Sequence, residues 1–184
     1  MVSRNGQRQT ANGALPTANR EPRTANMKKV FDGKHIYVFE RDGWEYVERK
    51  TAKEAVAIVA VADGKLILTE QYRRPVDARV IDLPAGLIEE HGPEETAKRE
   101  LDEETGYVCD RVELLIKAPT SPGITSEIVQ YYRAINPRKK GKGGGVGGED
   151  ITVHTIAVAE LEQWLKKQKS LVDGKVWTAV HFIA

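Results

Sequence analysis

Short runs of apolar and β-branched residues, separated by turn residues, fill most of the chain after Val30. Runs of this kind, about four to eight residues long, are typical of β-strands. They predict strands at 35–39, 44–49, 55–62, 65–72, 79–83, 112–116, 128–135 and 151–157. Asp63-Gly64 separates two of these runs and is a signature of a tight two-residue hairpin.

Fewer segments carry a helical signature. The clearest is 93–105, where Pro93 suits the first helical position and Gly106 suits a left-handed C-terminal cap. A second helix is expected at 159–169, and a third is expected to close the chain from Lys175. Many strands with few helices predict an α/β fold in which helices cover a mixed sheet. The glycine-rich segment 141–148 is expected to be a flexible connection between strands.

The composition fits one globular domain. The chain has 184 residues, of which 40% are hydrophobic and 30% charged, and its formal net charge is +1. A chain of this length can bury a sizeable core. Its single cysteine, Cys109, cannot form an internal disulfide, and no apolar run is long enough to span a bilayer. We therefore expect a cytoplasmic protein with no membrane partner, and the near-neutral charge argues against nucleic acid as a partner.

Residues 1–30 differ from the rest of the chain. They are basic, repeat Thr-Ala-Asn and contain no apolar signal core. This stretch predicts a disordered tail. It is either an inert leader upstream of a natural start at Met27 or a basic arm for an acidic partner. The folded domain is expected at 31–184.

Acidic residues gather on and before the helix expected at 93–105. Glu100, Glu103 and Glu104 share one face of it, because positions three and four apart are neighbours at about 3.6 residues per turn. Two interpretations are open. The carboxylates form a solvated face, at a cost of roughly 0.2–0.5 kcal/mol per like-charged pair, or they bind a hard divalent cation through oxygen.

The order of residues around this helix favours the cation. Gly86, followed by Arg99-Glu100-Leu101-Asp102-Glu103-Glu104-Thr105-Gly106-Tyr107, closely resembles the signature motif of Nudix hydrolases. The second half of the motif matches at every position except Tyr107, which replaces an aliphatic residue. In the first half the loop is one residue shorter and the usual Glu is missing. We expect Glu89 or Glu90 to pair with the arginine of the motif instead.

Flanking residues resemble the branch of the family that cleaves ADP-ribose and other nucleoside diphosphate sugars. The likeness lies in Glu70-Gln71-Tyr72-Arg73-Arg74-Pro75, in Leu83-Pro84-Ala85-Gly86, and in Pro122, which stands where that branch has a proline. Asp82 replaces a Glu that is usual there. The resemblance implies the Nudix fold, an α/β/α sandwich around a mixed β-sheet, with an N-terminal antiparallel strand region.

The resemblance also implies a metal site. A diphosphate repels an incoming hydroxide, so hydrolysis needs cations that neutralise the phosphates and acidify a bound water. Glu100 and Glu104 would be direct ligands, Glu103 would bind another ion or act through water, and Ala85 would contribute its carbonyl oxygen. The expected metal is Mg2+, with Mn2+ as the alternative.

Two further residues are expected to serve catalysis. Arg99 would orient the loop by pairing with a carboxylate. Glu149 ends the glycine-rich segment just before a late strand, where relatives in this branch often place a catalytic base on a mobile loop. We expect Glu149 to take a proton from the attacking water, with Glu103 as the alternative. A solvated hairpin charge is the other interpretation of Glu149.

Substrate contacts are expected from five residues. Arg73 and Arg74 are candidates for the phosphates, because a guanidinium binds two phosphate oxygens at once. The alternative is that they are solvated charges of a loop. Pro122 is assigned to the substrate site by the resemblance. The same resemblance places early strands at a two-fold interface, so we expect a homodimer in which Trp44 or Tyr46 of one subunit helps to close the pocket of the other.

We therefore predict a metal-dependent hydrolase that cleaves the diphosphate of ADP-ribose or a related nucleotide sugar, giving a nucleoside monophosphate and a sugar phosphate. One alternative is a Nudix hydrolase for a nucleoside triphosphate or a dinucleoside polyphosphate. Another is a Nudix-like module that senses ADP-ribose without turnover. The complete set Glu100, Glu103 and Glu104 argues against a pure sensor, which needs no metal site.

Overall fold

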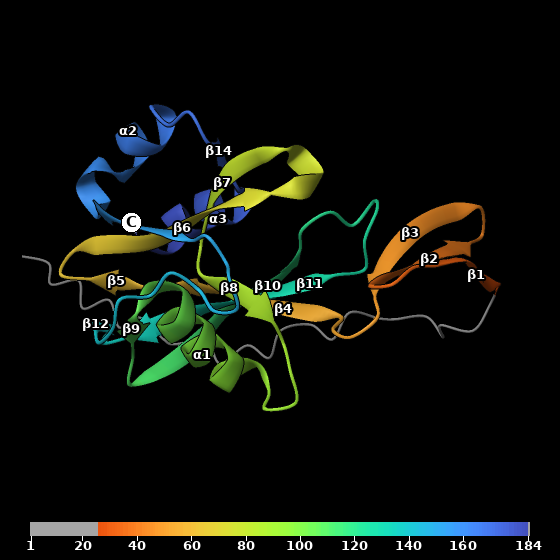
Figure 1. The fold of residues 1–184 in the computed structure, drawn as a ribbon, viewed down its shortest axis with the longest axis horizontal. Coiled ribbons are helices and arrows are strands. Elements are labelled where there is room, and N and C mark those ends of the chain that lie inside the picture. The colour runs from red at the N-terminus through yellow and green to blue at the C-terminus, as the bar shows by residue number, and fades with distance from the viewer. Residues whose placement is uncertain (1–25, 184) are drawn as a thin grey trace, which may run out of the picture.

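Two mixed β-sheets form the body of the protein in a computed structural model that describes residues 26–183 (Figure 1). One sheet has the strand order β10-β11-β4-β8, and the other has the order β13-β6-β7-β14 with β5 paired to β6. The pair β11/β4 is parallel and the pair β4/β8 is antiparallel. The strands are β4 (Glu54–Val59), β5 (Val61–Ala62), β6 (Lys65–Arg73), β7 (Ala78–Asp82), β8 (Ala85–Leu87), β10 (Arg111–Pro119), β11 (Ile128–Ile135), β13 (Thr152–Ala157) and β14 (Leu171–Val172).

Helices cover both sides of the sheets. The helix α1 (Pro93–Thr105) packs against β4, β8 and β10, whereas α2 (Leu161–Lys166) contacts β13 and α3 (Gly174–Ile183) contacts β7. In Figure 1, α1 lies on one side of the sheets and α2 and α3 lie on the other. The fold is the predicted α/β/α sandwich. None of the helices in the described residues is long and apolar enough to cross a membrane.

The core has two halves because β4 is buried on both faces. Ala55, Ala57 and Val59 point into the cluster that contains residues of α2 and α3. Their neighbours Val56 and Ile58 point into the cluster that contains Ala97 and Leu101 of α1. Successive side chains of a strand point to opposite faces, so an uninterrupted apolar run is what a central strand requires.

A separate antiparallel sheet precedes the body. It consists of β1 (Met27–Asp32), β2 (Ile36–Arg41) and β3 (Trp44–Arg49), and it projects to the side of the molecule (Figure 1). The backbone N–H of Val47 donates to the Ile124 carbonyl at 2.8 Å and ties this sheet to the loop before β11. Residues 1–25 of the predicted tail lie outside the described residues. Residues 27–30 belong to β1, so the predicted C-terminal boundary of the tail, residue 30, was too late in the chain.

Other differences from the sequence-based prediction concern short elements. The expected strand 55–62 is divided into β4 and β5. The second helix starts at Leu161, because Val158–Glu160 forms a 3-10 turn, and it ends at Lys166 rather than at 169. The strands β8 and β14 and the pair β9 (Tyr107–Val108) and β12 (Arg138–Lys139) were not predicted. Strands of two or three residues carry little periodic signal and form because a distant partner strand is present.

Candidate active site

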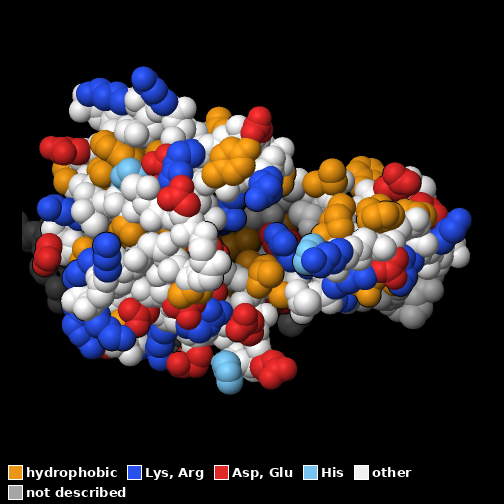
Figure 2. All heavy atoms as spheres, viewed as in Figure 1, with side chains coloured by type: hydrophobic (Ala, Val, Ile, Leu, Met, Phe, Trp, Pro, Cys, Tyr) orange, Lys and Arg blue, Asp and Glu red, His pale blue; other side chains and the backbone are white. Residues whose placement is uncertain are grey.

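A cleft of about 840 Å³ opens between α1, β8 and the elements β6, β7 and β14. Its polar walls come from distant parts of the chain. Charged residues that line it include Arg49, Arg73, Asp82, Glu89, Glu100, Glu104, Glu127, Glu149, Asp173 and Lys175. Figure 2 shows acidic and basic side chains interspersed over the face in view, in keeping with the near-zero net charge.

The helix α1 presents its carboxylates to the cleft because both of its ends and its apolar face are fixed. Pro93 occupies the first turn, and Gly106 ends the helix in the left-handed conformation with φ 68°. Ala97 and Leu101 are fully buried in the core. Truncating a buried leucine such as Leu101 costs about 2–5 kcal/mol, so this contact orients the helix firmly.

Gly86 lets β8 approach the helix closely. A Cβ at this position would lie 2.1 Å from Glu100 Oε1, so any side chain would displace that carboxylate. The backbone N–H of the neighbouring Ala85 donates to Glu104 Oε2 at 3.1 Å. The glycine of the motif therefore brings the β8 backbone within reach of two helix carboxylates.

The carboxylates of α1 are held in an environment that disfavours their charge. The Glu104 side chain is almost completely buried. Burial, together with the charges of Glu100 and Glu149, raises the pKa of Glu104 to about 8, although the Ala85 N–H acts in the opposite direction. Burial is also the main cause that raises the pKa of Glu100. Unfavourable charge concentrated in a cleft is typical of a functional site.

Arg99 sits among three of the carboxylates. Its guanidinium nitrogens lie 2.7 Å from Glu103 Oε2, 2.8 Å from Glu100 Oε1 and 3.4 Å from Glu89 Oε2. Of the two residues expected to replace the missing glutamate of the motif, Glu89 is therefore the one that pairs with Arg99. Glu103 faces this arginine and is absent from the cleft wall.

The donor set suits a hard divalent cation, which takes carboxylate and carbonyl oxygens. Within residues 26–183, however, the side chains form no ready-made group of three or more His, Cys, Asp or Glu residues around a metal position. Arg99 neutralises Glu100 and Glu103 in this arrangement. A cation at Glu104 would stabilise the carboxylate that burial disfavours, and Glu100 would have to turn from Arg99 to join it.

The glycine-rich loop is attached to the end of α1. The amides of Gly144 and Gly145 donate to the carbonyls of Glu104 and Glu103 at 2.8 and 3.0 Å. Gly143 has φ +70°, and a Cβ there would lie 2.3 Å from the Thr105 carbonyl carbon. The glycines thus allow close backbone contact with the helix, which is a different role from the flexible connection that composition predicted.

This attachment brings Glu149 to the cleft. Glu149 Oε2 accepts a hydrogen bond from the Val146 N–H at 3.2 Å, and the side chain lines the same cleft as Glu100 and Glu104. The next residue, Asp150, is paired with Arg79 at 3.0 Å. Backbone hydrogen bonds to α1 therefore hold the loop before Glu149, and an exposed ion pair follows Glu149.

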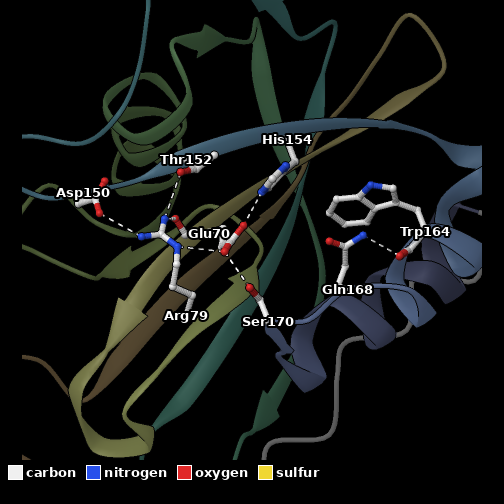
Figure 3. A network of polar contacts seen from close by, with 8 residues as sticks. All are labelled: Glu70, Arg79, Asp150, Thr152, His154, Trp164, Gln168 and Ser170. Atoms are coloured by element: carbon white, nitrogen blue, oxygen red, sulfur yellow. Dashed lines mark hydrogen bonds and ion pairs between the residues drawn. The ribbon is translucent and has the colours of Figure 1, made fainter.

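The pair of Arg79 and Asp150 belongs to a polar network behind the cleft (Figure 3). Arg79 Nε donates to Glu70 Oε1 at 3.0 Å, and the Ser170 hydroxyl donates to the same oxygen at 2.8 Å. His154 Nε2 lies 2.7 Å from Glu70 Oε2. Glu70 thereby joins β6 and β7 to β13 and to the segment before β14.

The expected substrate residues are not all brought together. Arg73 lines the cleft, whereas Arg74, in the 3-10 turn Arg74–Val76, does not. Trp44 and Tyr46 lie on β3, outside the cleft wall of this chain. Trp44 Nε1 donates to the Gly123 carbonyl at 3.0 Å, beside Pro122. Substrate contact by these outlying residues stays a prediction.

Several lining residues were missed by sequence reasoning. Lys175 begins the last helix and meets Asp82 and Asp173 in the cleft wall, and Arg49 pairs with Glu127 at 2.6 Å. None of them belongs to a recognisable motif in the sequence. Only the pairing of distant segments, such as β14 with β7, brings them to the site.

The fold and the site together define a class: an α/β/α protein with an acidic helix facing a glycine turn in a polar cleft. Comparison with known proteins makes this specific. The NUDIX domain family model matches residues 51–176. The chain therefore belongs to the NUDIX domain family and is a hydrolase.

Individual relatives carry different names. The chain is 32% identical over 173 residues to a methanol dehydrogenase activator of Bacillus methanolicus, covering 89% of this chain and 92% of the relative. It is 37% identical to an ADP-ribose pyrophosphatase of Bacillus subtilis, covering 62% of this chain and 66% of that one. The corresponding enzyme of Mycobacterium tuberculosis is 38% identical, with 68% and 66% covered. A crystal structure of an ADP compounds hydrolase shares the fold, with a TM-score of 0.66 and 22% identity over 86% of this chain and 89% of that one.

Proposed function

We propose that the chain hydrolyses the diphosphate bond of ADP-ribose or a related nucleoside diphosphate sugar. Water adds to one phosphorus, the bond from that phosphorus to the bridging oxygen breaks, and a nucleoside monophosphate and a sugar phosphate are released. Similarity to two ADP-ribose pyrophosphatases supports this substrate class. The observation that carries the proposal is the convergence of Glu100, Glu104 and Glu149 with Arg73 on one cleft.

The roles of the residues follow from charge. A diphosphate entering the cleft is attracted by Arg73, whose guanidinium can bind two phosphate oxygens. Glu100, Glu104 and the Ala85 carbonyl would hold a divalent cation, with Glu103 as a further ligand once it leaves Arg99. That cation, when bound, neutralises phosphate charge and acidifies the attacking water. We assign it as Mg2+, with Mn2+ as the alternative.

Glu149 is the proposed base. It faces the cleft, whereas Glu103 points to Arg99, so Glu149 is better placed to accept a proton from water. Arg99 is a positioning residue, because it joins Glu89 on the loop to Glu100 and Glu103 on the helix.

A homodimer is the proposed assembly. Hydrophobic side chains gather over the projecting N-terminal sheet (Figure 2), and Met27, Phe31 and Trp44 are 46%, 55% and 63% exposed. Covering such a patch with a second copy would remove it from water. Light scattering at micromolar concentration tests this: a monomer with full activity would contradict it.

A substrate panel tests the proposed reaction. Products formed in Mg2+ from ADP-ribose, GDP-mannose, a nucleoside triphosphate and a dinucleoside polyphosphate are separated and measured by chromatography. We expect the nucleotide sugars to give the highest kcat/KM. Turnover confined to the triphosphate or the dinucleotide would redirect the substrate class, and binding of ADP-ribose without turnover would indicate a sensor.

A second candidate is activation of a dehydrogenase. The similarity to the methanol dehydrogenase activator extends over 173 residues, compared with 122 for the Bacillus subtilis pyrophosphatase. The test adds the chain to a methanol dehydrogenase and measures alcohol oxidation. An increase in rate would support this role, and no change would leave the hydrolase proposal alone.

A further inference from the structure

A second group of charged side chains lines the cleft, contributed by β7 and by the start of α3. Lys175 Nζ lies 3.0 Å from Asp82 Oδ2 and 2.8 Å from Asp173 Oδ2. The Asp82 side chain is 4% exposed and that of Lys175 is 15% exposed. All three residues line the cleft, and the proposed hydrolysis gives none of them a role.

Arg73 connects this group to the acidic helix. Its Nη2 lies 4.0 Å from Asp82 Oδ2, and its charge also acts on Glu104. A diphosphate bound by Arg73 would therefore have the α1 carboxylates on one side and the group Asp82, Asp173 and Lys175 on the other. A substituent of the diphosphate that extends away from α1 would reach the latter group.

The chemistry of the group suits hydroxyls and opposes another phosphate. Two carboxylates flank one ammonium, so a phosphate would meet more negative than positive charge. A sugar hydroxyl can donate to a carboxylate and accept from the ammonium. An ammonium has three N–H donors, and in the part of the chain that the structure describes, two carboxylate oxygens face Lys175 Nζ.

The group is held in place before any ligand binds. The Asp173 N–H donates to the Ile81 carbonyl at 2.9 Å, and Asp173 Oδ1 accepts from the Lys175 N–H at 2.8 Å. The segment that leads to Asp173 is anchored by the Ser170 hydroxyl on Glu70 (Figure 3). Groups ordered in advance bind a ligand at a lower entropic cost.

We propose that Asp82, Asp173 and Lys175 bind the hydroxyl groups of the sugar in the nucleotide-sugar substrate and select for a sugar at that end. This inference rests on the proposed hydrolysis and deepens it. It assigns sugar recognition to the end of β7 and the start of α3, outside the motif that handles the diphosphate.

The test compares two substrates with the same diphosphate: ADP-ribose and the butyl ester of ADP, which has no hydroxyl at that end. A site built to bind hydroxyls rejects an analogue without them, so we expect a wild-type preference of about 100-fold or more in kcat/KM. Asp173→Asn and Lys175→Met should reduce the preference at least about tenfold by lowering kcat/KM for ADP-ribose alone. Lys166→Met, an exposed lysine of α2 paired with Glu162, is the matched control and should retain the wild-type preference.

Lys175→Met leaves the buried Asp82 without its partner and can prevent folding. The double variant Asp82→Asn/Lys175→Met removes both buried charges and should fold. Asp173→Asn should also fold, because the Asp173 side chain is 32% exposed. The inference would be overturned, and the hydrolase proposal would stand, in either of two cases. In the first, Asp173→Asn and the double variant keep the wild-type preference for ADP-ribose. In the second, these variants lose kcat/KM equally for ADP-ribose and for the butyl ester. If the wild-type protein cleaves neither of these substrates nor GDP-mannose, the hydrolase proposal fails and the inference fails with it.

Discussion

At the scale of single residues, Glu104 combines near-complete burial with a raised pKa. Its carboxylate accepts the Ala85 N–H and lies near the charges of Glu100 and Glu149. Burying a carboxylate is costly unless it is paired with a cation or binds a metal. A solvated helix face would leave the Glu104 carboxylate in water instead. This favours the metal over the solvated face, the two interpretations that the sequence left open.

We predict that Glu104→Gln lowers kcat by at least about 100-fold, since metal catalysis supplies several kcal/mol and each 1.36 kcal/mol is tenfold in rate. The amide is nearly isosteric and never ionises, whereas a carboxyl with a folded-state pKa of about 8 must take up a proton on folding at pH 7. The metal-free variant should therefore be as stable as wild type or more stable. Steady-state kinetics and urea unfolding measure the two effects. A folded variant with wild-type Mg2+-dependent turnover would contradict the assignment.

For Glu149→Gln we predict a loss of about 10- to 1000-fold in kcat with little change in KM, the usual contribution of a general base. Asp150→Asn is the control. Asp150 is 85% exposed and points to Arg79, so its substitution should have a much smaller effect. Wild-type kcat for Glu149→Gln across pH 6 to 9 would place the base elsewhere, with Glu103 the next residue to test.

At the scale of elements, the sequence predicted the helix 93–105 and its cap correctly because the signals are local. Pro93, Gly106 and the apolar pair Ala97 and Leu101 lie within one helix. The role of the glycine-rich loop could not be predicted in this way. Its glycines are needed for contact with α1, about forty residues earlier, and composition alone does not distinguish close approach from flexibility.

A matched pair of substitutions tests this role of the loop. Gly143 and Gly147 have similar φ angles, +70° and +66°, but a Cβ at Gly143 would meet the Thr105 backbone whereas one at Gly147 would meet open space. We predict that Gly147→Ala costs about 1–2 kcal/mol of unfolding free energy, the price of a left-handed non-glycine residue. Gly143→Ala should cost clearly more and also lower kcat. Equal losses in urea unfolding would show that the contact is unimportant.

The Glu70 network gives a prediction about pH. Burial, the largest single influence, acts to raise the pKa of Glu70, but hydrogen bonds with His154, Ser170 and Arg79 outweigh it and hold the pKa below 4.5. A carboxylate with a lowered folded-state pKa stabilises the fold above its unfolded pKa, and this contribution is lost as pH falls through the folded value.

Glu70→Gln should therefore destabilise the protein at pH 7, and the difference from wild type should shrink below about pH 4.5. Urea midpoints between pH 3 and 7 measure this. Glu162→Gln on the exposed face of α2 serves as the control and should change little. A constant difference across that range would show that the charge of Glu70 is not what joins these strands.

At the scale of the whole molecule, the α/β/α sandwich followed from many strands, few helices and the motif around α1. The set of residues that line the cleft could not be predicted from the sequence. Asp82, Asp173 and Lys175 meet because β14 pairs in parallel with β7, and a strand of two residues leaves no pattern from which that pairing can be predicted. The sequence could name Glu100 and Glu104 as candidates because they belong to a motif, but it could not name the residues that tertiary pairing brings to the cleft.

The central claim is that this chain splits the diphosphate of a nucleotide sugar at the carboxylate-lined cleft. Chromatography of ADP-ribose incubated with the purified full chain tests it most directly, with Mg2+ present and again after chelation. We predict equal amounts of AMP and ribose 5-phosphate with Mg2+ and neither product after chelation. Intact ADP-ribose and intact GDP-mannose in the presence of Mg2+ and Mn2+, or cleavage that survives chelation, would contradict the account.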